Sequence, residues 1–224
     1  MAYLDAEQHK IVSDAVGAAE LNTSGEIVTV LADRSGDYTD VVQLYSVAIA
    51  FSVMSVFALF PQPILDLWDN LIGGWTHQWT AGEIATMTIA IGLVAFGLSW
   101  LAFSWEKLRF AAVPGPLKTA RVHAQAVKHF KVGAERRTHG RTGVLIYLSM
   151  CEHRAEIVAD QPIAELVSAD VWGDAMADML EEIREGCIAE GLAAGVRDVG
   201  GILSKHFPRS VDDTNELPDR LIEV

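Results

Sequence analysis

Two long apolar stretches without a formal charge constrain this chain more than any other feature of its sequence. VVQLYSVAIAFSVMSVFALF covers residues 41–60, and IATMTIAIGLVAFGLSWLAFSW covers residues 84–105. Each has the length that a helix needs to cross a hydrocarbon core about 30 Å thick. A charged residue in mid-bilayer costs on the order of 3 kcal/mol. The absence of Asp, Glu, Lys and Arg from both stretches therefore favours membrane spans over buried helices of a soluble domain. The sequence therefore predicts a two-helix transmembrane hairpin over residues 41–105.

The charges around the hairpin predict its orientation. The loop 61–83 contains Asp66, Asp69 and Glu83 but no Lys or Arg, whereas basic residues flank the hairpin on both sides. Lys and Arg near membrane spans favour the cytoplasmic side. We therefore expect a multi-pass protein of the cell (inner) membrane, with the soluble segments and both termini in the cytoplasm and the loop external. Amphipathic rings favour the interface; the tryptophans expected there are Trp68, Trp75 and Trp79 on the outer side and Trp100 and Trp105 on the inner side.

A hairpin returns the chain to the side that it left, so the segments that flank it can pack together. Residues 1–40 form the first half of the expected domain and residues 106–208 the second half, followed by a disordered tail, 209–224. Strand patterns alternate with helical ones, which predicts an α/β sandwich: a small central sheet flanked by helices and interrupted by the hairpin. A further strand beyond the three obvious ones is left open. Those three are EIVTVLA (26–32), GVLIYLSM (143–150) and RAEIVA (154–159).

Composition excludes several classes of function. A net charge of -13 argues against a nucleic-acid binder, which needs basic surface. The two cysteines, Cys151 and Cys187, have no CxxC spacing, so a disulfide framework or a cysteine zinc site is not expected. The sequence also contains no dinucleotide-binding, P-loop or nucleophile-elbow motif.

Acidic residues near the ends of the expected strands are the candidate site. Glu26 opens the first strand, Glu152 lies in the turn between the second and third, and Asp160 ends the third. Ligands of α/β proteins gather at strand ends, and several carboxylates together suit Ca²⁺ or Mg²⁺. We name these three as candidate metal ligands. The alternative is that each is a helix cap or a solvated surface carboxylate.

Over nearly all of its soluble part, the chain resembles the TPM-domain family. The motifs are AELNTSGEIVTVL (19–31), HFKVGAERRTHGRTGVLIYLSMCEHRAEIVAD (129–160) and VWGDAMADMLEEIREGCIAEGLAAGVRDVGGILSKHFP (171–208). The resemblance implies an α/β sandwich, with relatives described as calcium binders, acid-phosphatase-like enzymes or accessories in assembly, repair and receptor modulation. Glu152, Arg154 and Asp160 match its turn-and-strand motif, and Glu26 matches its first-strand step. The hairpin and DQPIAELV (160–167), which replaces a glycine-rich segment, depart from the family pattern.

Two functions stay open at this stage, and with them the question whether the chain is an enzyme. The first is a membrane-anchored TPM-like accessory or binding module, with or without a divalent cation, whose partners are the bilayer and other membrane proteins. The second is a metal-dependent phosphatase acting on phosphate esters near the membrane, with Arg154 and Asp160 as candidate catalytic residues. In a purely structural alternative, the hairpin packs against other membrane proteins through Gly92, Ala95 and Ser99.

Overall fold

The computed structural model describes residues 3–71, 78–133, 142–210 and 217–224. The chain divides into two compact units: unit 1 combines Met1–Gly36 with Gly115–Val224, and unit 2 is Asp37–Pro114. In chain order, the helices and strands are α1 (Ala6–Glu20), β1 (Glu26–Ala32), α2 (Thr39–Leu59), α3 (Gln62–Leu71), α4 (Ala81–Phe103), α5 (Glu106–Ala112), α6 (Gly115–Gly133), β2 (Gly143–Ser149), β3 (Arg154–Ala159), α7 (Gln161–Leu166), α8 (Ala169–Arg184), α9 (Ile188–His206) and β4 (Ile222–Glu223).

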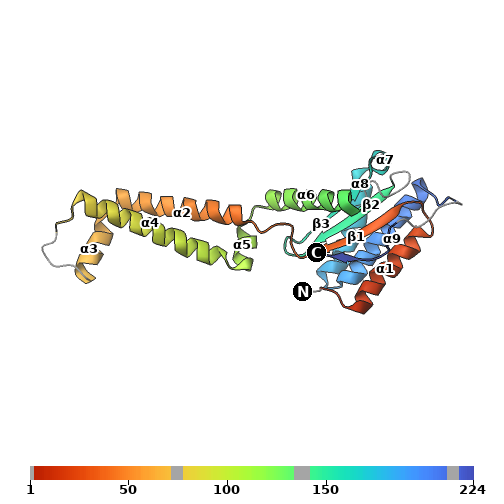
Figure 1. The fold of residues 1–224 in the computed structure, drawn as a ribbon, viewed down its shortest axis with the longest axis horizontal. Coiled ribbons are helices and arrows are strands. Elements are labelled where there is room, and N and C mark those ends of the chain that lie inside the picture. The colour runs from red at the N-terminus through yellow and green to blue at the C-terminus, as the bar shows by residue number, and fades with distance from the viewer. Residues whose placement is uncertain (1–2, 72–77, 134–141, 211–216) are drawn as a thin grey trace. The chain divides into compact units, whose positions relative to one another are not determined.

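Unit 1 is built on a mixed sheet with the strand order β3-β2-β1-β4 (Figure 1). β1 pairs in parallel with β2 over seven residues, from Glu26 opposite Gly143 to Ala32 opposite Ser149. β3 runs antiparallel to β2, and β4 runs parallel to β1. The predicted β2–β3 hairpin turns at His153, whose φ of 52° lies in the left-handed region. The α/β class predicted from the sequence is confirmed.

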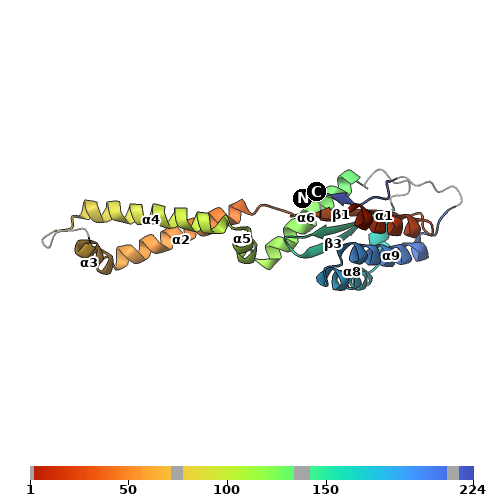
Figure 2. The ribbon, with the colours of Figure 1, turned by 90° about the horizontal axis from the view of Figure 1, so that it is seen from below.

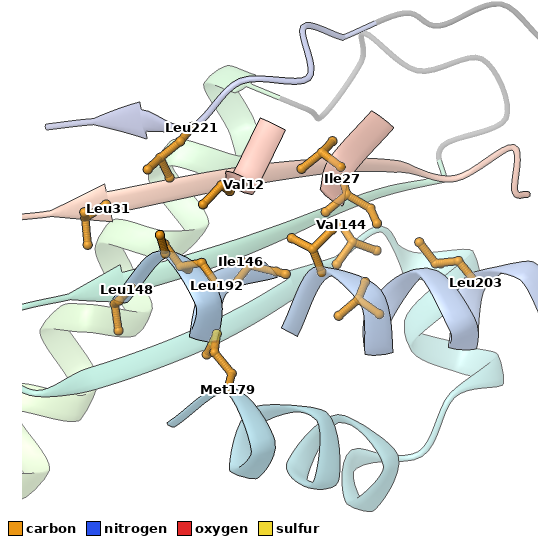
Figure 3. Packing of buried hydrophobic residues seen from close by; sticks show 14 of the residues in the cluster. Val12, Ile27, Leu31, Val144, Ile146, Leu148, Met179, Leu192, Leu203 and Leu221 are labelled. Carbon is orange, nitrogen blue, oxygen red and sulfur yellow. The ribbon is translucent and has the colours of Figure 1, made fainter. Parts of the chain in front are cut away.

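Helices cover both faces of this sheet (Figure 2). α1, α8 and α9 pack on one face around Ile27, Val144 and Ile146, and Figure 3 shows this cluster. α6 packs on the other face against Val28 and Leu145. Every residue of β1 and β2 is buried, which explains why their apolar runs are nearly continuous rather than alternating.

The two ends of unit 1 differ in how well their sequence signals predict them. α1 begins with a capping box, because Asp5 accepts a hydrogen bond from the backbone of Gln8 at 2.8 Å and the Gln8 side chain accepts one from the backbone of Asp5 at 3.0 Å. The expectation of a disordered tail over 209–224 is wrong for its last residues. Leu217 and Leu221 are buried against the domain, and the tail pairs with β1 as strand β4.

Unit 2 contains two helices that are long and apolar enough to cross a membrane. α2 and α4 have mean hydropathies of 1.9 and 2.0, and they pack side by side (Figure 1). Gly92 marks a close approach, since a Cβ built there would lie 2.3 Å from the sulfur of Met54. Gly92 thus lets α2 pack closely against α4. Between the two helices, the short helix α3 forms part of the loop, whereas Trp75 lies outside the described residues.

Two adjacent glycines of α9 give a test of how tightly unit 1 is packed. A Cβ on Gly200 would lie 2.6 Å from the Cβ of Ala19 in α1, whereas a Cβ on Gly201 would meet nothing within 4 Å. We expect Gly200→Ala to lower the free energy of unfolding by about 1–3 kcal/mol, because α1 must move. Gly201→Ala should raise it by about 0.5–1 kcal/mol through helix propensity. Denaturant unfolding of both variants measures this; equal effects would contradict the close α1–α9 contact.

Candidate functional site

The polar groups of unit 1 gather at both ends of the parallel strand pair. At the carboxyl end, β1 is followed by Asp33, Arg34 and Ser35, and β2 is followed by the turn that contains Glu152. The carboxyl ends of parallel strands are where α/β proteins place ligands. This end therefore forms the candidate site.

A continuous chain of hydrogen bonds crosses this end of the sheet. Ser35 Oγ lies 3.0 Å from the Tyr147 hydroxyl and 2.9 Å from Ser149 Oγ, and Ser149 Oγ donates to Glu152 Oε2 at 2.6 Å. The backbone N–H of Ser35 donates to Glu152 Oε1 at 3.0 Å. When the Tyr147 hydroxyl donates to Ser35, each serine accepts one bond and donates one, and the chain ends on the carboxylate. We call these four residues the strand-end network.

The strand-end network is buried. Ser149 is 0% exposed, Tyr147 1%, and Ser35 and Glu152 4% each. Burial is the main cause that raises the pKa of Tyr147, so its phenol stays protonated and available as a donor. The imidazole of His129 stacks on the Tyr147 ring at 5.6 Å between centroids, and burial lowers the pKa of His129. A fully hydrogen-bonded, water-excluded network of this kind fixes the two loops that follow β1 and β2.

Asp33 forms a second, more exposed layer above the network. Its carboxylate accepts hydrogen bonds from the Tyr3 hydroxyl and, at 2.7 Å, from Arg34 Nε. The Tyr3 bond first, and then the Arg34 bond, holds the pKa of Asp33 below its usual value. The same hydrogen bond raises the pKa of Tyr3. The start of the chain is thereby attached to the carboxyl end of β1.

The sequence-predicted site residues do not come together in one place. Glu26 lies at the amino end of the strand pair, opposite Gly143, and Asp160 is there too, accepting from Gly143 N at 3.0 Å. Glu152 lies at the carboxyl end, and so does Arg154, which pairs with Ser149. Arg154 and Asp160 are thus separated by the length of β3, about 20 Å at 3.3 Å per residue. Among the described residues, no group of three or more His, Cys, Asp and Glu side chains is arranged to hold a metal ion.

At the amino end, the carboxylates serve the backbone. Asp160 exchanges bonds with Gly143, because its own N–H also donates to the Gly143 carbonyl at 2.9 Å. Glu26 Oε2 accepts from Leu217 N at 3.2 Å and so holds the returning tail. Glu20 Oε1 accepts from Ile27 N at 2.8 Å, and its side chain also bonds to Asp219. Burial, opposed by the Ile27 bond, raises the pKa of Glu20 to about 8.

The residues that sequence reasoning missed are those of the strand-end network other than Glu152, together with Glu20. Ser149 and Tyr147 interrupt an otherwise apolar strand, and Ser35 follows β1. Polar groups at the carboxyl ends of two parallel strands were therefore an available signal. The pairing of Glu20 with Asp219 had no such signal, because the two lie at opposite ends of the chain.

Substitutions at Glu152 test the strand-end network. Glu152→Ala leaves the Ser35 N–H without its carboxylate acceptor, and we expect it to lower the free energy of unfolding by about 2–4 kcal/mol. Glu152→Gln should cost much less, because its amide can donate to Ser149 while the hydroxyl chain reverses direction. Denaturant unfolding compares both with Glu181→Ala, an exposed control expected to change stability by less than about 0.5 kcal/mol. A Gln variant as unstable as the Ala variant would argue against a reversible hydroxyl chain.

Glu20 predicts a specific dependence of stability on pH. Its pKa is higher in the folded chain, about 8, than the ordinary 4.5, so the folded state binds the proton more tightly. The stabilisation that protonation of Glu20 contributes is complete below pH 4.5 and is lost as the pH rises to about 8. Over this range the free energy of unfolding falls by at most about 1.4 kcal/mol per pH unit. Glu20→Gln, which keeps a donor toward Asp219, should flatten this decline. The free energy of unfolding is measured between pH 5 and 9 for Glu20→Gln and for a control on the same helix, the exposed Glu7→Gln. Parallel pH profiles for the two variants would refute the role of Glu20.

Comparison with known proteins adds information on the fold. No protein-family model matches this chain, and no curated protein matches it. A solved structure does: the NMR structure of BA42 protein from the psychrophilic bacteria Bizionia argentinensis sp. nov., with a TM-score of 0.57 and 21% sequence identity. The match covers 100% of this chain and 97% of that one. At this identity the likeness establishes a similar fold and nothing about function.

Proposed function

We propose that this chain is a membrane-anchored accessory or binding module, in which a TPM-like α/β domain is split by a transmembrane hairpin. The observation that carries the proposal is the exposure of α2 and α4. Only 28% and 11% of their most apolar windows are buried, although their mean hydropathies are 1.9 and 2.0. A core helix of a soluble protein buries its apolar surface, and an exposed apolar surface of this extent is a liability in water. A lipid environment would accommodate it.

Hydroxyl groups along both helices support the same proposal. Each of several Ser and Thr side chains donates to a carbonyl four residues earlier in its own helix, at 2.7–3.0 Å. Such internal bonds satisfy hydroxyl groups where no water is present. Ser46, fully buried within unit 2, has no hydrogen-bond partner among the described residues. The residues that bond back in this way are Ser52, Ser55, Thr86, Thr88, Ser99 and Ser104.

The orientation proposed is a cell (inner) membrane protein with unit 1 and both termini in the cytoplasm. The loop 61–83 carries three carboxylates and no Lys or Arg, whereas Arg34 precedes the hairpin and Lys107 and Arg109 follow it. This asymmetry follows the positive-inside rule. Because the chain enters and leaves the hairpin on one side, unit 1 is attached to the bilayer at two points.

A binding or accessory role is proposed in preference to phosphatase chemistry. Arg154 and Asp160 lie at opposite ends of β3, so they do not flank one phosphate group. The hydroxyls of Ser35 and Ser149 are buried and hydrogen-bonded, which leaves neither available as a nucleophile. We also do not propose a single Ca²⁺ or Mg²⁺ site formed by Glu26, Glu152 and Asp160. Glu26 and Asp160 lie at the amino end of the parallel strand pair, whereas Glu152 lies at its carboxyl end.

Cysteine accessibility in intact cells tests the membrane topology. After replacement of Cys151 and Cys187 by Ser, single cysteines are introduced as Asn70→Cys in α3 and Lys10→Cys in α1, both at exposed positions. An impermeant thiol reagent should label the first in intact cells and the second only after permeabilisation. Labelling of the α1 cysteine in intact cells, or of the α3 cysteine only after permeabilisation, would exclude the proposed orientation.

Excision of unit 2 tests the split-domain proposal. Residues 37–114 are replaced by a flexible Gly/Ser linker that joins Gly36 to Gly115. We expect the shortened chain to be soluble and to give a dispersed NMR spectrum, because the described core of unit 1 comes from its own residues. The full chain should stay with membranes after alkaline extraction. A further deletion of residues 1–36 removes β1 and should abolish folding; an aggregated or molten shortened chain would contradict the proposal.

A further inference from the structure

An apolar groove runs along α4 within unit 2. It has a volume of about 1030 Å³, at the upper end of the range typical of small-molecule sites. From Thr80 to Leu98 it follows α4 for about 27 Å at 1.5 Å per residue, close to the thickness of a hydrocarbon core. Val53 of α2 and Trp68 of α3 contribute to its walls. The lining residues further along α4 are Thr86, Met87, Ala90, Ile91, Val94, Ala95 and Leu98.

The polar groups of this groove are gathered at one end, which we call the mouth. Trp79, Thr80 and Glu83 line it at the start of α4. Trp79 Nε1 donates to Asp69 Oδ2 at 3.1 Å, which ties α3 to the mouth. The other oxygen of that carboxylate, Asp69 Oδ1, is buried without a hydrogen-bond partner among the described residues. Asp69 does not line the groove, so its carboxylate acts on a bound molecule through its charge.

The charge at the mouth selects the kind of ligand. The loop 61–83 holds Asp66, Asp69 and Glu83 and no Lys or Arg, so a headgroup with a net negative charge is repelled there. Tryptophan rings attract ammonium groups through their π faces, and carboxylates attract them directly. Trp68, Trp79 and Glu83 line the groove, and the Asp69 carboxylate is bonded to Trp79. This set matches a molecule with an ammonium head and a hydrocarbon chain.

We propose that this groove binds a phospholipid with an ammonium headgroup, whose acyl chain lies along α4 and whose ammonium group lies among Trp68, Trp79 and Glu83, with the charge of Asp69 behind Trp79. The inference rests on the proposed function, since the groove opens to lipid only if α2 and α4 cross a bilayer. The acyl chain would cover the apolar side chains of α4, and the ammonium group would face the rings of Trp68 and Trp79 and the carboxylate of Glu83. The hairpin would then distinguish lipids as well as anchor the domain.

Native mass spectrometry of the full chain tests this inference. The protein is purified in mild detergent from membranes that hold equal amounts of phosphatidylethanolamine and phosphatidylglycerol. We expect bound phosphatidylethanolamine to exceed bound phosphatidylglycerol by about fivefold, the factor that corresponds to one cation–π contact of about 1 kcal/mol. Equal retention, preference for phosphatidylglycerol, or no bound lipid would overturn the proposal.

Matched variants locate the lipid in the groove. Ala90→Phe fills the groove and should abolish lipid retention, whereas Ala85→Phe, at an exposed α4 position outside the lining, should retain it. The double variant Asp69→Asn, Glu83→Gln should bind lipid with no headgroup preference. Asn can still accept from Trp79, and Gln suits the capping box that Glu83 forms with Thr80. Equal retention by both Phe variants, or an unchanged preference in the double variant, would refute the assignment.

Two further outcomes are distinguishable. A lipid-free dimer that Ala90→Phe dissociates would mean that a second copy of the hairpin occupies the groove, which overturns the lipid assignment. Alkaline extraction of the same membranes separates this failure from failure of the proposed function. A chain that resists extraction but retains no lipid contradicts only the groove inference, whereas a chain that is extracted contradicts the membrane anchor itself.

Discussion

The parallel pairing of β1 with β2 is the contact on which the rest of the structure depends. It joins the two segments of chain that the hairpin separates, and both strands are buried along their whole length. Closing so long a connection costs entropy that grows only slowly with its length. Contacts inside unit 2 lower this cost further, because Tyr38 stacks edge-on against Phe110 at 5.4 Å and Tyr45 donates to the Ala112 carbonyl at 3.3 Å. The entry and exit of the insertion are thus held together.

The direction of β3 explains why the candidate carboxylates divide between two ends of the sheet. Asp160 follows β3, but β3 runs antiparallel to β2, so its carboxyl end lies beside the amino ends of β1 and β2. The rule that ligands gather at carboxyl ends applies to the parallel strands alone. Glu152, which follows β2, obeys that rule, and Asp160 does not. The sequence motif that joins Glu152, Arg154 and Asp160 is therefore continuous along the chain but not in space.

Local and periodic signals were predictable, and contacts between distant segments were not. The capping box at Asp5, the buried runs of β1 and β2 and the β2–β3 turn follow from patterns within a few residues. β4 has two residues in a polar tail, too few for a strand pattern, and only the burial of Leu221 beside it reveals why it pairs. The strand-end network joins Ser35 to Ser149 across residues that no local pattern connects. Its geometry depends on the β1–β2 register, which sequence reasoning did not specify.

The partners of serine and threonine hydroxyl groups show how each unit forms its side-chain hydrogen bonds. In unit 1, buried hydroxyls such as Ser35 and Ser149 find partners on other segments, and these bonds hold distant loops together. In unit 2, several serine and threonine hydroxyls along α2 and α4 bond back to their own helices, whereas Ser46 has no partner among the described residues. Hydrogen bonds that stay within a helix are what hydrocarbon requires. Such bonds also occur in unit 1, where Thr119 donates to Gly115 and Ser204 donates to Gly201. What distinguishes unit 2 is that they follow one another along two exposed apolar helices, and this combination supports the proposed membrane anchor.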